Sequence, residues 1–140
     1  REERERLENY RKTKYIEKLY PDLCDTFKYS DNKYSIVVPS CAADILDEAS
    51  QQRNCVGGYA DRHLSGTTII LFLRKTSDIG RSFGTLEIGR RNGSYYFVQA
   101  YAAGNKHLPK DAQKWLDKWL NNVNKVKRAQ NRIALALAVG

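Results

Sequence analysis

Apolar and polar positions recur along this 140-residue chain with the periods of helices and strands. Residues 2–20 are highly charged and carry apolar side chains at loosely helical spacing, which predicts a solvated helix that ends at Pro21. Residues 26–30 and 33–38 are rich in β-forming side chains and flank Asp31-Asn32. This pattern is typical of a β-hairpin.

A second helix is predicted directly after this hairpin. Ser40 is placed to cap it, and apolar side chains follow at the spacing i, i+3, i+4 and i+7, namely Ala42, Ile45, Leu46 and Ala49. The helix runs into the most unusual stretch of the chain, Asn54-Cys-Val-Gly-Gly-Tyr-Ala60.

Three further strands are predicted over residues 67–75, 83–88 and 95–101. Asn92-Gly93 lies between the last two, and this dipeptide is the strongest short signal for a hairpin turn. After Pro109 comes a long helix with one apolar stripe, made of Ala112, Trp115, Leu116, Trp119, Leu120, Val123 and Val126. The predicted fold is therefore α+β: a mostly antiparallel sheet of about five strands with helices before, between and after, and the long C-terminal helix packed on the sheet.

Polar side chains inside the apolar strands can be assigned to faces, because residues i and i+2 of a strand share a side. Arg74 shares a face with Ile70 and Phe72, Glu87 shares one with Thr85, and Gln99 shares one with Tyr95, Phe97 and Tyr101. We expect Arg74, Glu87 and Gln99 to converge on the face away from the C-terminal helix, as the polar floor of a pocket. The alternative is an ordinary ion pair between Arg74 and Glu87 on a solvated face.

Cys55 is a candidate for chemistry because it lies where a helix gives way to Gly57-Gly58. A thiol at such a place can have a lowered pKa and act as a nucleophile, with His63 or His107 as its base. The alternative is a packed structural thiol, since free cysteines are among the most buried residues.

Several classes of site have no support in the sequence. The three cysteines, Cys24, Cys41 and Cys55, show no C-x-x-C spacing, so we expect neither a disulfide scaffold nor a metal site, but a reduced, cytoplasmic domain. No glycine-rich nucleotide motif occurs, and we expect no cofactor. The longest apolar run, residues 133–139, is too short to span a bilayer.

Charge adds an anionic partner to the possibilities, because 24 Lys and Arg against 16 Asp and Glu give a net charge of +8. Most of the excess lies near the C-terminus, where the candidate nucleic-acid-binding residues are Lys106, Lys110, Lys114, Lys118, Lys125, Lys127 and Arg128. Four of them, Lys114, Lys118, Lys125 and Arg128, form a predicted positive ridge that can follow phosphates without reading sequence. The alternative is the lysine-rich outer face of any amphipathic helix.

The ordered set of motifs resembles the PcfJ-like domain of conjugative plasmids, integrative elements and phages. The resemblance spans roughly residues 34–120 and rests on Asn54-Cys-Val-Gly-Gly-Tyr-Ala60, Ile70-Leu-Phe-Leu-Arg-Lys75, Thr85-Leu-Glu-Ile88, Gln99 and Gly104-Asn105. The matching positions are Cys55, Gly57, Tyr59, Arg74, Glu87, Gln99 and Asn105. Asn54 is a departure, because the family pattern often has histidine before the cysteine.

The resemblance implies a mobile-element protein that works with nucleic acid, expected to be DNA, or with a relaxase-type partner in conjugative transfer. We expect an N-terminal charged helix at 1–22, the PcfJ-like domain at 23–130 and an apolar C-terminal tail at 131–140.

Two other functions remain open. One is an enzyme acting on an anionic or nucleic-acid-related substrate, with Cys55 as nucleophile or pocket wall, Glu87 as acid or base, Arg74 holding the anionic group, and Gln99, Gly57, Gly58, Tyr59 and Asn105 completing the pocket. The other is a protein-interaction module that uses the N-terminal helix and the apolar end.

Overall fold

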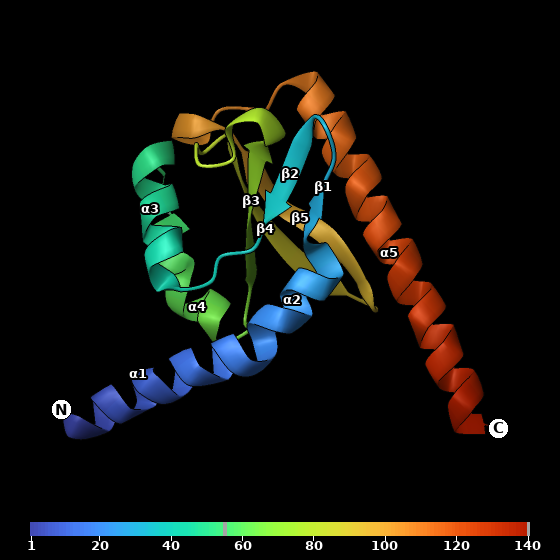
Figure 1. Ribbon diagram of the computed structural model, residues 1–140, viewed down its shortest axis with the longest axis horizontal. Coiled ribbons are helices and arrows are strands. Elements are labelled where there is room, and N and C mark those ends of the chain that lie inside the picture. Colours follow the sequence, from blue (N-terminus) through green and yellow to red (C-terminus); the bar gives the residue numbers. More distant parts are fainter. Residues whose placement is uncertain (55, 140) are drawn as a thin grey trace.

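A five-stranded antiparallel sheet separates two groups of helices in the computed structural model, which describes residues 1–54 and 56–139 (Figure 1). The strands follow one another across the sheet in chain order: β1 (Tyr29–Ser30), β2 (Tyr34–Val37), β3 (Ile69–Lys75), β4 (Gly84–Arg91) and β5 (Ser94–Tyr101). At the β4–β5 turn, Asn92 and Gly93 both have positive φ, at 53° and 79°, as the sequence signal requires.

The helices lie before, between and after the strands. They are α1 (Glu2–Lys14), α2 (Tyr20–Phe27), α3 (Ala42–Gln52), α4 (Ala60–Leu64) and α5 (Lys110–Val139), with short turns at η1 (Tyr15–Leu19, a π-helical turn), η2 (Val56–Tyr59), η3 (Thr76–Asp78) and η4 (Ala103–Asn105). Helices α3 and α4 cover one side of the sheet, and α5 runs along the other (Figure 1). The predicted α+β class is confirmed.

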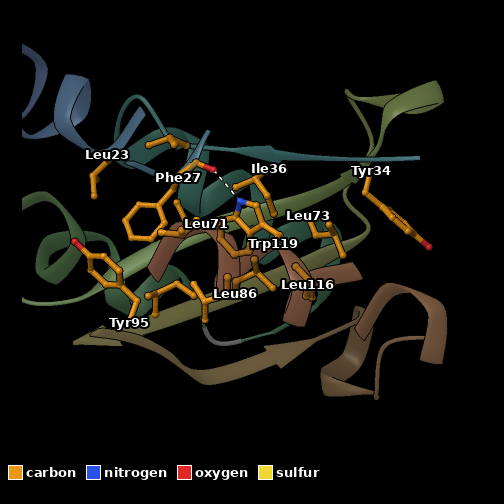
Figure 2. Packing of buried hydrophobic residues seen from close by; sticks show 14 of the residues in the cluster. Leu23, Phe27, Tyr34, Ile36, Leu71, Leu73, Leu86, Tyr95, Leu116 and Trp119 are labelled. Carbon is orange, nitrogen blue, oxygen red and sulfur yellow. Dashed lines mark hydrogen bonds between the residues drawn. The ribbon is translucent and has the colours of Figure 1, made fainter. Parts of the chain in front are cut away.

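The main core lies between the sheet and α5 (Figure 2). Leu71, Leu73 and Leu86 are fully buried there and meet the apolar stripe of α5, made of Ala112, Leu116, Trp119, Leu120 and Val123. The Trp119 indole N–H donates to the carbonyl of Phe27 at 3.2 Å, which fastens α5 to the end of α2. Val126, expected in the stripe, is 56% exposed, so the buried part of the stripe ends at Val123.

A smaller cluster fills the opposite face of the sheet. It consists of Ile45, Val56, Ala60, Ile70 and Phe72. This face also carries the buried polar side chains of β3 and β4, so it is the face on which a site was expected.

The N-terminal helical region continues past Pro21, so the predicted end is wrong. Pro21 occupies the first turn of α2, where a helix does not need the missing backbone N–H. The π-helical turn η1 joins α1 to α2.

Helix α3 also differs from the prediction. Cys41, rather than Ser40, is its N-cap residue, while the Ser40 backbone N–H and hydroxyl both donate to the Asp44 carboxylate at 2.8 Å. Leu46 is 56% exposed, whereas Glu48 and Gln52 are buried with Ile45. The reason is that α3 packs on a partly polar region of the sheet, which provides partners for a buried carboxylate.

A β-bulge changes the predicted faces of β5. Glu87 pairs with Gln99, but Ile88 pairs with Phe97, which leaves Val98 as an extra residue in β5. Tyr95 and Phe97 therefore pack in the main core on the α5 side, while Gln99 and Tyr101 face the other way. The expectation that all four share one face is wrong.

Candidate functional site

A cavity of about 440 Å³ opens on the face of the sheet away from α5. Strands β3, β4 and β5 form its floor, and η2 and the segment around η4 form its rim. Its lining residues are Asn54, Val56, Tyr59, Ile70, Thr85, Leu86, Glu87, Gln99, Tyr101, Asn105 and His107.

Glu87 is the charged group on the floor of this cavity, and its side chain is held by two neutral donors. Its Oε1 accepts a hydrogen bond from the Gln99 amide at 2.9 Å, and its Oε2 accepts one from the Thr68 hydroxyl at 2.6 Å. The pairing of Glu87 with Gln99 across β4 and β5 brings the two side chains together. Glu87 is only 6% exposed, so its carboxylate is fixed and largely desolvated.

Arg74 lies on the same face but not in the cavity. Its Nη2 is 2.8 Å from Oε1 of Glu48 on α3, and its guanidinium lies over the ring of Phe72. The Thr85 hydroxyl donates to the other Glu48 oxygen at 2.7 Å. This buried network neutralises the charge of Arg74. That Arg74 holds an anionic group of a substrate stays a prediction.

Sequence reasoning missed Glu48 because α3 was interpreted from its apolar positions alone. A usable signal was present, since Glu48 follows Ile45 by three residues and precedes Gln52 by four, so all three lie on one face of the helix. The strand pattern places Thr85 on the face of Glu87 and Tyr101 on the face of Gln99 but predicts no role for either, and both line the cavity.

The rim brings together residues from distant parts of the chain. The Asn54 side chain lies 3.4 Å from the Thr85 hydroxyl and accepts the Val56 backbone N–H at 3.0 Å. Tyr101 forms a β-bridge with His107, and their ring centroids are 6.4 Å apart. Asn105 precedes this bridge with a φ of 60°.

The remaining predicted residues near the rim are in η2. Gly57 and Gly58 lie between Val56 and Tyr59, two residues that line the cavity. Cys55 is outside the described residues, so its role as nucleophile or pocket wall stays a prediction.

His63 is a buried structural residue and not a base for the cavity. Its Nδ1 accepts the Ile70 backbone N–H at 2.8 Å, so in the neutral ring the proton is on Nε2, which lies 2.8 Å from the Tyr15 hydroxyl. That hydroxyl donates to the Pro39 carbonyl. The chain of hydrogen bonds ties η1 to α4 and β3, and burial lowers the pKa of His63 to about 4.

This burial makes stability depend on pH. The His63 pKa falls from 6.5 in the unfolded chain to about 4 in the folded one. The unfolded chain therefore binds the extra proton first, and stability that is complete above pH 6.5 is lost as pH falls toward 4. We expect the free energy of unfolding to drop by about 2 kcal/mol between pH 7 and pH 5, measured by urea denaturation.

The variant that tests this assignment is His63→Gln, which removes the buried titratable ring and should lose most of this pH dependence. A wild-type free energy of unfolding that stays constant from pH 7 to pH 5 would contradict the assignment of His63 as a buried neutral side chain.

A second candidate surface lies on α5, which runs along the side of the sheet opposite α3 and α4 (Figure 1), whereas the cavity opens on their side. Lys110, Lys114, Lys118, Lys125, Arg128 and Arg132 are all exposed and fall on one line along the helix. We call these six residues the basic ridge. From Lys110 to Arg132 it is about 33 Å long at 1.5 Å per residue.

The charges of the basic ridge are free for a ligand. Within residues 1–54 and 56–139, the one ion pair found joins Arg74 and Glu48, so no ridge cation is engaged in one. Two of the predicted basic residues lie elsewhere: Lys106 precedes α5, and Lys127 is half-buried on another side of the helix.

Comparison with known proteins identifies the family. The PcfJ-like protein family matches residues 1–116, which is most of the chain and begins well before the 34–120 span of the sequence resemblance. The chain belongs to the PcfJ-like family. An uncharacterized protein of Listeria innocua serovar 6a is 35% identical over 101 residues, which are 71% of this chain and 21% of that protein. The chain thus spans about a fifth of the curated relative that it matches, and no solved structure matches it.

The positions that resemble the PcfJ-like pattern gather at the cavity. Tyr59, Glu87, Gln99 and Asn105 line it, and Arg74 lies beside it in the ion pair with Glu48. The basic ridge, by contrast, extends past residue 116, where the family match ends.

Two further findings concern the described part of this PcfJ-like chain. None of its helices combines the length and apolar character required to cross a membrane. It also contains no group of three or more His, Cys, Asp or Glu side chains positioned to bind a metal ion.

Proposed function

We propose that this PcfJ-like chain is an accessory domain of a mobile genetic element and binds nucleic acid, DNA in particular, through the basic ridge of α5. The observation that carries the proposal is the line of exposed cations, none of which has an ion-pair partner in the part of the chain that the structure describes. Membership of the PcfJ-like family supports the mobile-element setting, in which a relaxase-type protein bound to DNA is the alternative partner.

The ridge suits the phosphate backbone better than it suits a single anion. Its cations are spaced along about 33 Å, whereas duplex DNA presents one phosphate charge for about every 1.7 Å of its axis. Several ridge residues therefore meet successive phosphates at the same time. Each contact displaces condensed counterions, so binding by this surface falls steeply with salt and does not depend on base sequence.

Reversing three ridge charges tests the proposal. We expect Lys114→Glu, Lys118→Glu and Lys125→Glu together to weaken binding of a labelled DNA duplex at least about tenfold. The slope of log K against log [salt] should become less negative by about 3, since each lost phosphate contact contributes about 0.9 to that slope. Fluorescence polarisation over a salt series measures both quantities.

The control carries the same change in net charge on α1. Arg4→Glu, Arg11→Glu and Lys14→Glu also replace exposed basic residues of a helix, but away from the ridge. An equal loss of affinity in both triple variants would show that net charge alone drives binding. Unchanged binding by the α5 variant would exclude the ridge as the interface.

A further inference from the structure

The cavity on the other face of the sheet contains a charge that the fold leaves unneutralised. Buried carboxylates are ordinarily paired with a cation, but among residues 1–54 and 56–139 the partners of Glu87 are two neutral groups, the Thr68 hydroxyl and the Gln99 amide. A carboxylate has about four acceptor positions, two on each oxygen. One position on each oxygen is used, so one on each is left, and together they suit a ligand with two adjacent N–H donors.

The cavity also offers a donor next to this acceptor pair. A glutamine amide has two N–H groups, and Gln99 uses one of them for Glu87. The second is left for an acceptor on the ligand. The floor therefore presents two acceptor positions of Glu87 beside one N–H donor of Gln99.

The walls favour a flat ligand. Tyr59, Tyr101 and His107 line the same cavity, and aromatic side chains stack on planar rings. The volume of about 440 Å³ lies in the ordinary range for small-molecule sites, about 300–1,000 Å³.

From these three features we infer that the cavity is a second binding site and that it takes a guanine base. The base presents two adjacent donors, its ring N1–H and its 2-amino group, beside the 6-carbonyl acceptor. The donors match the free positions of Glu87, and the carbonyl matches the second N–H of Gln99. The ring then lies between the aromatic side chains of the rim.

Other ligand classes fit less well. A free phosphate or carboxylate meets the negative charge of Glu87 and finds Arg74 already paired with Glu48. Adenine presents one amino donor beside a ring acceptor, so it leaves one position of the carboxylate unmet. A guanidinium group consists only of donors and gives the Gln99 amide nothing to bind. The site is independent of the basic ridge, which lies on the opposite side of the sheet.

A series of uncharged nucleosides tests the inference on the wild-type chain. We expect isothermal titration calorimetry to show binding of guanosine, with inosine, which lacks the 2-amino group, and adenosine each about ten- to a hundredfold weaker. Agmatine serves as the guanidinium probe. No binding of guanosine at millimolar concentration, equal binding of guanosine and inosine, or tighter binding of agmatine than of guanosine would each overturn the inference.

Two substitutions test whether the nucleoside binds in the cavity. Glu87→Gln should remove the preference for guanosine over inosine, and circular dichroism checks that it is folded. Tyr101→Leu removes an aromatic wall without altering the carboxylate and should weaken all nucleosides. Its matched control is Tyr96→Leu, because Tyr96 is an exposed tyrosine of the same strand outside the cavity lining.

Guanosine binding that survives both Glu87→Gln and Tyr101→Leu unchanged would place the ligand elsewhere and refute the site. The triple ridge variant separates this inference from the proposed function, since it should lose DNA and keep guanosine. Loss of guanosine affinity in that variant would contradict the independence of the two sites.

Discussion

Replacing Arg74 with methionine is expected to lower the free energy of unfolding by about 3–5 kcal/mol, since it leaves the Glu48 carboxylate buried without a countercharge. Glu48 is 1% exposed, and its ion-pair partner is Arg74. The remaining Thr85 hydroxyl is a neutral donor and does not compensate a full charge. Urea denaturation followed by tryptophan fluorescence measures the loss.

The double variant Glu48→Gln with Arg74→Met shows whether the unpaired charge is the cause. Its glutamine carbonyl can still accept from Thr85, so much of the lost stability should return. Arg81→Met is the matched control, because Arg81 is exposed, and it should change stability by no more than about 0.5 kcal/mol. If Arg74→Met lowered the free energy of unfolding as little as Arg81→Met does, the buried ion pair would be contradicted. If the double variant were no more stable than Arg74→Met, the lost packing of Arg74 would matter more than the unpaired charge.

Replacing Trp119 with alanine is the second large change, with an expected loss of about 3–5 kcal/mol. Trp119 is 5% exposed and packs near the rings of Phe27 and Phe97, with centroid distances of 6.1 and 6.4 Å. The substitution opens a cavity between α5 and the sheet and removes the hydrogen bond to the Phe27 carbonyl. Thermal and urea unfolding both report this loss.

Val126→Ala is the control on the same helix. Val126 is 56% exposed, so its truncation should cost no more than about 0.5 kcal/mol. If Trp119→Ala cost as little as Val126→Ala, the packing of α5 on the sheet would be wrong, and with it the separation of the basic ridge from the cavity.

The sequence predicted the elements well where apolar residues alone determine them. The strands β3 and β4, the Asn92-Gly93 turn and the apolar stripe of α5 follow from the residues within each segment, and all three are present in the structure. Prediction failed for α3, where Glu48 is buried because Arg74 and Thr85 meet it from other elements. Periodicity along one segment carries no information on such partners.

The candidate site was predicted in part for the same reason. Glu87 and Gln99 were expected on one face, and the cross-strand pairing brings them together. The extra residue Val98 was not visible in the pattern, because a bulge depends on the register between two strands. Because of this bulge, Phe97 faces the main core and Gln99 faces the cavity, so β5 contributes side chains to both.

The sequential strand order has a consequence for how the chain folds. The β4–β5 pair closes across a two-residue turn, whereas pairing β2 with β3 must close the whole segment from Val37 to Ile69, which contains α3 and α4. The entropy lost on closing a loop grows with its length. Pairing β4 with β5 therefore loses less entropy than pairing β2 with β3, and we expect the β4–β5 hairpin to form first. We therefore expect the α3–α4 segment, which carries Glu48 and the η2 part of the cavity rim, to pack after β3, β4 and β5 have paired, and to unfold locally at a lower free energy than the β4–β5 hairpin.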